Sequence, residues 1–131
     1  MKTFLLASAL TLGISGFAAA QEAPKFFSET YPEHALQSAL EAKGALASEE
    51  AALDAKTREL ISLAVAAQVP CTYCSYSHTK NARAQGASDD EIREAVAAAA
   101  QVRHWSTVLN GMQYDLEAFK SEVDEMSGAN K

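Results

Sequence analysis

Residues 54–86 of the chain read DAKTRELISLAVAAQVPCTYCSYSHTKNARAQG, and this stretch decides the fold. Asp54 is a residue type that caps helix N-termini, and the apolar residues after it recur at helical spacing up to Pro70, which ends the helix. The segment from Cys71 to Gln85 is predicted to form the next helix, closed by Gly86. The first of these two helices is strongly apolar and is expected to lie in the core. Its apolar positions are Leu60, Ile61, Leu63, Ala64 and Val65.

Helical signals cover the chain from Glu33 onward. Ser88 and Glu91 have the spacing of a capping box, which opens a long helix that the pair Asn110-Gly111 breaks or kinks. No stretch alternates with period two for long enough to predict a strand, so the fold class is all-α. Residues 21–33 carry two prolines and no clear period and are interpreted as a leading arm. The other predicted helices are Glu33 to Lys43, closed by Gly44, and a last segment that contains Tyr114, Leu116, Phe119 and Val123.

The composition restricts the classes of partner. Of the 131 residues, 48% are hydrophobic and 21% are charged, which is typical of one globular domain. The chain has 11 basic and 17 acidic side chains and a net charge of −6. Because binding to nucleic acid depends mainly on Lys and Arg side chains that neutralise phosphates, a nucleic-acid partner is not expected. The same sign of charge disfavours an anionic membrane surface.

The N-terminal residues have the pattern of an export signal. Lys2 supplies a positive charge, residues 4–17 are mainly apolar, and residues 18–20 are alanines of the kind that a signal peptidase accepts. We expect cleavage near Ala20, which leaves residues 21–131 as one mature domain in the periplasm or outside the cell. A membrane anchor needs about 20 strongly apolar residues, and serine, threonine and glycine interrupt this run. No membrane partner is therefore expected after cleavage.

The chemistry is concentrated in residues 70–78, PCTYCSYSH. Pro70 fixes the chain just ahead of a helix, so Cys71 and Cys74 fall in its first turn, where unpaired backbone N–H groups and the helix dipole favour a thiolate. His78 follows Cys74 by four positions and shares its helix face, which places the imidazole to accept the thiol proton. Two thiols at this spacing can also close a disulfide, so the pattern indicates nucleophilic or redox chemistry.

Other functions of the cysteine pair stay open at this point. One is a static disulfide, although so short a loop gains little stability from it. Another is a zinc site formed by Cys71, Cys74, His78 and a carboxylate, although structural zinc sites usually take a second ligand pair from elsewhere. Haem attachment is excluded, because Ser75 stands where that motif needs a histidine. The favoured interpretation, a redox pair, requires no metal and no cofactor.

Glu59 precedes Cys71 by twelve positions, on the preceding helix. If Pro70 turns the chain back so that the two helices pack antiparallel, Glu59 faces His78 across the gap. A carboxylate in that place would orient the imidazole and stabilise its protonated form, as the third member of nucleophile–base–orienter systems does. The alternative interpretation is an exposed glutamate paired with a nearby lysine or arginine.

The spacing of these residues, together with the octapeptide LDAKTREL at residues 53–60, resembles the signature of the AhpD-like branch of the carboxymuconolactone decarboxylase superfamily. The resemblance extends from about Leu53 to Leu116. It implies an all-helical fold built on a helical hairpin, assembled into homotrimers or homohexamers. The chain departs from the family in length, since its single copy of the motif must assemble with other subunits to complete the sites. The resemblance also implies thiol-dependent reduction of hydroperoxides, or of the disulfide of a partner peroxiredoxin, with an external thiol donor.

Carried over to this chain, the resemblance makes Cys74 the thiol whose proton is relayed, Cys71 its disulfide partner, His78 the base and Glu59 the orienter. Such proteins often carry a further histidine just before the second cysteine, where this chain has Tyr73. Because tyrosine is a poor proton carrier near neutral pH, this departure favours disulfide chemistry over peroxidase turnover. The decarboxylase branch of the superfamily lacks the cysteine pair. Decarboxylase-like activity is therefore one alternative, and a non-catalytic oligomeric module with a static disulfide or zinc is the other.

Overall fold

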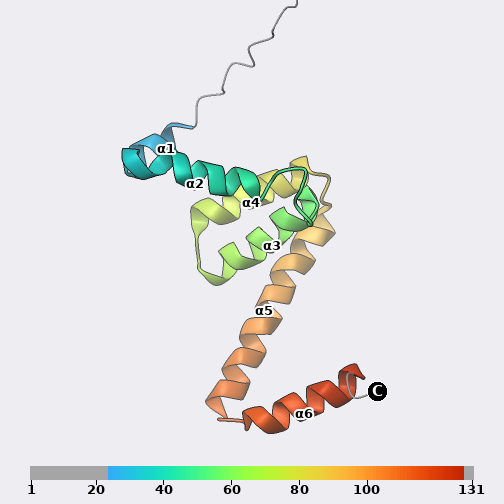
Figure 1. The fold of residues 1–131 in the computed structure, drawn as a ribbon. Helices are drawn as coiled ribbons and strands as arrows, with labels where there is room; N and C mark the ends of the chain where they lie inside the picture. The colour runs from blue at the N-terminus through green and yellow to red at the C-terminus, as the bar shows by residue number, and fades with distance from the viewer. Residues whose placement is uncertain (1–23, 129–131) are drawn as a thin grey trace, which may run out of the picture. The chain divides into compact units, whose positions relative to one another are not determined.

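The described part of the chain is helical, which confirms the all-α prediction (Figure 1). The computed structural model describes residues 24–128, so the export signal predicted for residues 1–20 lies outside the described residues. No helix in this range is both long and apolar enough to cross a membrane. The helices of residues 24–128 are α1 (Lys25–Thr30), α2 (Glu33–Ala45), α3 (Ala55–Gln68), α4 (Thr72–Ala84), α5 (Asp89–Gly111) and α6 (Leu116–Ser127).

The chain divides after Gly44 into two compact units, which are described separately. The expected leading arm over residues 21–33 is wrong for residues 25–30, which form α1, because a helix of 6 residues is too short to show an apolar period. α2 follows Pro32 and continues to Ala45, so Gly44 lies in its last turn rather than after it. The single mature domain over residues 21–131 stays a prediction.

In the second unit, α3 packs against both α4 and α5. Leu63 and Ala66 of α3 are buried, but Ile61 and Val65 are 49% and 56% exposed. The expectation that the whole apolar run lies in the core is therefore wrong at these two positions, because two neighbouring helices cover only part of the circumference of a third. The core of the described residues is small and mostly alanine: Leu63, Ala66, Ala82, Ala87 and Ala99.

α4 ends in a Schellman motif at the glycine that the sequence marks as its stop. Gly86 has φ +83°, in the left-handed region that side-chain-bearing residues rarely adopt. The N–H of Ala87 donates to the carbonyl of Ala82 at 2.9 Å, and the N–H of Gly86 donates to the carbonyl of Arg83 at 3.0 Å, which is the hydrogen-bond pairing of this motif. Ala82 and Ala87 are both buried, so the motif joins the end of α4 to the core.

Replacing Gly86 by alanine is expected to lower the free energy of unfolding by about 1 to 2 kcal/mol, because a Cβ atom is strained in the left-handed conformation. No atom lies within 4 Å of a Cβ placed there, so the backbone alone sets the effect. Equilibrium unfolding in urea measures it as a lower midpoint with an unchanged slope. Gly111→Ala is the matched control, since Gly111 ends α5 and also has open space around it. An equal decrease in the free energy of unfolding in the two variants would contradict this explanation.

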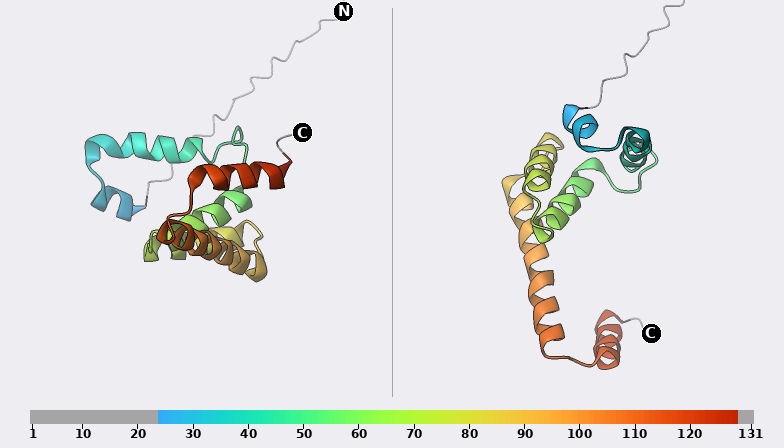
Figure 2. Two further views of the ribbon diagram at one scale, coloured as in Figure 1. Left: turned by 90° about the horizontal axis from the view of Figure 1, so that it is seen from below. Right: turned by 90° about the vertical axis from the view of Figure 1, so that its left-hand side faces the viewer.

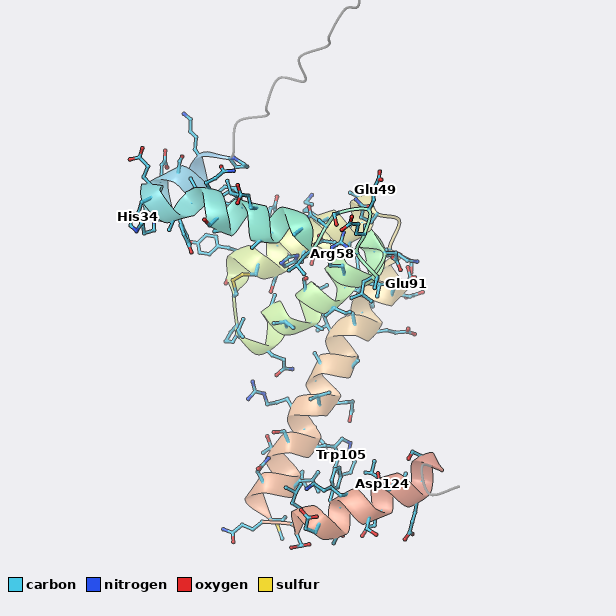
Figure 3. The ribbon with its side chains drawn as sticks, viewed as in Figure 1. His34, Glu49, Arg58, Glu91, Trp105 and Asp124 are labelled. Atoms are coloured by element: carbon cyan, nitrogen blue, oxygen red, sulfur yellow. A yellow bond between two sulfur atoms is a disulfide. The ribbon has the colours of Figure 1, made fainter. Side chains whose placement is uncertain are left out.

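α5 begins with the capping box that the sequence predicts. Ser88 Oγ accepts a hydrogen bond from the N–H of Glu91 at 3.1 Å, and Glu91 Oε2 accepts one from the N–H of Ser88 at 2.7 Å. Glu91, labelled in Figure 3, also forms an ion pair with Lys56 of α3 at 2.7 Å. The Lys56 ammonium lowers the pKa of Glu91, and the Glu91 carboxylate raises the pKa of Lys56. The start of α5 is thereby attached to α3.

This ion pair predicts a pH dependence of stability. Because the pKa of Glu91 is lower in the folded than in the unfolded chain, its contribution is present above the unfolded pKa and is lost as the pH falls through the folded pKa. Glu91→Gln is therefore expected to reduce the fall in Tm between about pH 6 and pH 3, the range in which carboxyl groups titrate. Thermal unfolding followed by circular dichroism measures it. Glu94→Gln on the same helix is the control. If it reduces the fall in Tm as much as Glu91→Gln does, the pH dependence does not come from the ion pair between Lys56 and Glu91.

The C-terminal half of α5 extends beyond α3 and α4, and α6 follows at its far end (Figures 1 and 2). Trp105, labelled on this extension in Figure 3, is 56% exposed. α6 packs against no other helix within residues 24–128. Further exposed apolar residues of the extension and α6 are Val102, Met112, Leu116 and Met126.

Candidate active site

Cys71 lies at the junction of α3 and α4. Its backbone N–H donates to the carbonyl of Ala66 at 3.0 Å, which closes the end of α3. Its Sγ accepts a hydrogen bond from the N–H of Cys74 at 3.2 Å, so Cys71 is the N-cap residue of α4. The helix predicted from Cys71 to Gln85 is therefore one residue shorter at each end, because both of these residues act as caps.

Cys71 and Cys74 form a disulfide at the start of α4, drawn as the yellow bond in Figure 3. Cys74 occupies the third position of the helix, so both sulfurs lie at the end where backbone N–H groups lack intrahelical partners. The helix dipole is positive at this end and stabilises a thiolate once the disulfide is reduced. The structure thus shows the oxidised pair in a place that favours the ionised form of the reduced pair.

Glu59 and His78 are brought together across the hairpin of α3 and α4. Oε2 of Glu59 lies 2.7 Å from Nδ1 of His78. The side chains are 18% and 30% exposed, respectively, so the contact is partly shielded from solvent. With the carboxyl group ionised, Nδ1 carries the proton and Nε2 is left as the basic nitrogen of the ring. The contact therefore fixes both the tautomer and the orientation of the imidazole.

The imidazole of His78 lies about one helical turn after Cys74 along α4. His78 stands four positions after Cys74, so their side chains share one face of the helix. In the disulfide form, Glu59 is the only hydrogen-bond partner of the His78 ring within residues 24–128. The hairpin thus collects all four residues that the sequence singles out, and their catalytic roles stay predictions.

The other two histidines of the chain are on α2 and α5, and Tyr73 is exposed. Tyr73, which replaces the additional histidine, is 89% exposed. His34 belongs to α2 of the first unit. His104 is on α5, with its ring edge-on to Trp105 at 5.2 Å between ring centroids.

An open groove of about 590 Å³ lies beside the disulfide, along α4. Cys71 lines this groove and Cys74 does not. No single motif in the sequence indicates this groove, although hydroxyl and basic residues recur on α4 at the helical spacing of a second face. The other lining residues are Ala67, Pro70, Thr72, Ser75, Tyr76, Thr79, Lys80 and Arg83.

The arrangement also bears on the zinc interpretation of the pair. Within residues 24–128, no three His, Cys, Asp or Glu side chains are grouped so that they can hold a metal ion together. The two sulfurs are bonded to each other, and His78 is paired with Glu59. A zinc site built on Cys71, Cys74 and His78 would first require reduction of the disulfide.

A helical hairpin with a Cys-x-x-Cys pair at the start of its second helix and a glutamate–histidine pair across its two helices defines an AhpD-like protein. The sequence model of the Carboxymuconolactone decarboxylase family matches residues 34–116, more than half of the chain. The chain belongs to this family, and the resemblance seen in the sequence is confirmed.

Two individual proteins are similar to this chain, and the first of them supports the AhpD-like branch. The crystal structure of the alkylhydroperoxidase AhpD core from Rhodospirillum rubrum matches with a TM-score of 0.59 and 35% sequence identity, over 64% of this chain and 62% of that chain. Uncharacterized protein 4 in the cox locus of Paracoccus denitrificans is 43% identical over 54 residues, which are 41% of this chain and 49% of that protein. The chain thus matches about half the length of this curated relative.

Proposed function

We propose that the chain is an exported thiol-dependent oxidoreductase that uses Cys71 and Cys74 to reduce hydroperoxides or to exchange disulfides with a protein partner of the peroxiredoxin type. The observation that carries the proposal is the 2.7 Å contact between Glu59 and His78, on the same hairpin as a cysteine pair at a helix N-terminus. Membership of the AhpD-like branch supports it. An oriented base and a dipole-stabilised sulfur are together the requirements for an activated thiol nucleophile.

In the peroxidase direction, Nε2 of His78 takes the proton of the Cys74 thiol. The Cys74 thiolate attacks one peroxide oxygen and breaks the O–O bond, which gives a sulfenic acid on Cys74, while the leaving alkoxide takes the proton from His78. The Cys71 thiol then attacks the sulfenic sulfur, and water leaves as the disulfide forms. An external thiol donor supplies the two electrons that reduce the pair again.

Parallel steady-state assays of the purified protein test the proposal. Hydrogen peroxide, cumene hydroperoxide and an oxidised peroxiredoxin are each offered with dithiothreitol as a neutral donor. At least one substrate is expected to be consumed faster than without protein, in a reaction that prior alkylation of the reduced pair abolishes. Rates at the background level for all three would refute the proposed function.

The presence of a closed disulfide also favours a second candidate, a non-catalytic oligomeric module with a static bond. Metal analysis and thiol titration distinguish the two. The oxidoreductase is expected to contain no stoichiometric zinc and to release two thiols under mild reductants. A pair that resists mild reductants, or one zinc ion bound per chain after reduction, would support the static module instead.

Assembly into a homotrimer or homohexamer is part of the proposal. The core within one chain is small, whereas α5 and α6 expose Trp105, Met112 and Leu116. An apolar groove of about 370 Å³ between α3 and α5, lined by Leu60, Ile61 and Val102 among others, adds to this surface. Burying such a surface against further copies would stabilise a marginal subunit. Native mass spectrometry is expected to show three or six copies, and a monomer at micromolar concentration would contradict it.

Export is the remaining part of the proposal. It rests on the signal-like residues 1–20, and it requires a thiol donor outside the cytoplasm. The mass of the protein recovered from the periplasm or the medium is expected to correspond to a chain that starts near Gln21. A full-length chain confined to the cytoplasm would contradict export.

A further inference from the structure

The groove beside the disulfide is lined by only one cysteine of the pair. Cys71 is among its lining residues, whereas Cys74 is not. The structure holds the oxidised pair, and the reactant that an oxidised pair meets in a thiol-redox cycle is a thiol. The groove is therefore placed to receive the thiol donor, with Cys71 as the sulfur under attack.

The charge of the groove differs in sign from that of the chain. Lys80 and Arg83 line it and no carboxylate does, although the whole chain has a net charge of −6. Arg83 is paired with Asp89 at 2.9 Å on the exposed surface. The Lys80 ammonium lies 5.9 Å from the centre of the Tyr76 ring and forms no ion pair within residues 24–128. Lys80 is thus a cation available to a ligand in the groove.

The spacing along α4 sets the size of such a ligand. Lys80 follows Cys71 by nine positions, which corresponds to about 13 Å along a helix. Because helical side chains lean toward the N-terminus, the rise between the ammonium group and the sulfur is shorter than this, and a ligand that reaches both would span roughly 10 Å. Thr72, Ser75 and Thr79, which carry hydroxyl groups, also line the groove.

We infer that the groove selects a thiol donor that carries a carboxylate, or a similar anionic group, roughly 10 Å from its sulfur, with Lys80 binding the anionic group and Cys71 taking the attack. This inference rests on the proposed function, since it names the donor class for the same cysteine pair. It predicts that the oxidised protein reacts faster with an anionic thiol than with a neutral one. The negative charge of the whole chain would produce the opposite order of rates.

Reduction of the disulfide by the donor takes two steps. The donor thiolate attacks Cys71 Sγ, the bond between the two cysteine sulfurs breaks, and Cys74 leaves as a thiolate that the N-terminal end of α4 stabilises. A second donor thiolate then attacks the donor sulfur of the mixed disulfide. Cys71 leaves as a thiolate that the N–H of Cys74 stabilises by the cap hydrogen bond seen at 3.2 Å. Two donor thiols are oxidised to one disulfide, and the protein disulfide is reduced to two thiols.

The test compares mercaptohexanoate with mercaptohexanol, two thiols of equal length that differ in the terminal group. The rate of reduction of the oxidised protein is measured at equal thiolate concentration by acid quenching and mass spectrometry. At low salt the acid is expected to react about three to five times faster, which is the range of an exposed ion pair. This preference is expected to fall toward one at about 0.5 M salt, where the Debye length is only a few ångströms.

Three variants assign the preference to the groove, with the acid-to-alcohol rate ratio as the readout. Lys80→Met is expected to bring the ratio to one or below, and Asp89→Asn, which frees Arg83, is expected to raise it. Lys120→Met removes a lysine of α6 outside the groove and is expected to leave the ratio unchanged. Chymotryptic cleavage after Tyr73 separates the two cysteines and is expected to locate the quenched adduct on Cys71.

The outcomes separate this inference from the proposed function. Equal rates for the two thiols in the unchanged protein, a preference that survives Lys80→Met, or an adduct on Cys74 would overturn the inference while the oxidoreductase stands. If neither thiol reduces the disulfide, the proposed function fails and the inference fails with it.

Discussion

Replacing Cys74 by serine is expected to lower hydroperoxide turnover by roughly three orders of magnitude or more, because a hydroxyl group in that place is not ionised and cannot form the sulfenic acid or the disulfide. Cys74 is the cysteine that shares a helix face with His78, and it lies at the N-terminal end of α4. The loss is expected in the initial burst as well as in steady state. Stopped-flow measurement of the first turnover checks this.

The Cys71→Ser protein is the matched control for this prediction. It keeps Cys74, His78 and Glu59, so the first attack on the peroxide is expected to proceed, whereas the disulfide cannot close. A sulfenic acid should then accumulate on Cys74, where a dimedone probe captures it with an increase in mass. If instead the Cys74→Ser protein keeps the burst and Cys71 is captured, the roles of the two sulfurs are reversed.

Glu59→Gln is expected to lower turnover by about a hundredfold near neutral pH, the lower end of the range for general acid–base catalysis. The amide keeps the size of the side chain but removes the negative charge that lies 2.7 Å from Nδ1 of His78. The imidazole then loses the partner that fixes its tautomer and stabilises its protonated form. The defect is expected to shrink above about pH 9, because cysteine thiols ionise there without help.

Glu94→Gln, on the exposed face of α5, is the control for the loss of one carboxylate. It is expected to keep the turnover and the pH profile of the unchanged protein. The unfolding midpoint of both variants is measured alongside, so that a structural loss is separated from a catalytic one. A Glu59→Gln protein with the same turnover and the same pH profile as the unchanged protein would remove the glutamate from the mechanism.

Local signals in the sequence predict most helix ends correctly, because each end is determined by one or two residues. Asp54 caps α3 through a hydrogen bond from the N–H of Thr57 at 2.9 Å. The capping box of α5 and the Gly86 stop of α4 are equally local. α1 is not predictable in this way, because 6 residues without a side-chain cap leave no such signal.

Packing between helices is less accessible to sequence reasoning. The apolar run of α3 suggests a fully buried helix, yet Ile61 and Val65 are about half exposed within one chain. Apolar side chains indicate that a helix face will be buried. They do not indicate whether it is buried by the same chain or by another copy. The ion pair between Lys56 and Glu91 is not predictable for a related reason, since nothing in the sequence indicates which lysine pairs with which glutamate.

The site shows the same division between local and non-local information. The positions of Cys71, Cys74 and His78 on one helix follow from their spacing. The contact between Glu59 and His78 depends on the turn at Pro70. The sequence predicts this contact only if that turn makes α3 and α4 pack antiparallel. The groove could not be predicted from the sequence, because its lining residues come from the end of α3, the connection and a second face of α4, and include only one of the two cysteines.

The claim on which the function depends is that Cys74 is ionised at neutral pH. The most direct measurement is the rate of alkylation of the reduced protein by iodoacetamide between pH 5 and pH 10, with Cys74 quantified after chymotryptic cleavage at Tyr73. We predict that the Cys74 rate reaches its plateau by about pH 7.5 and is higher there than that of free cysteine, because most of the thiol is already ionised. A rate that follows free cysteine throughout, rising through about pH 8.5, would contradict the account.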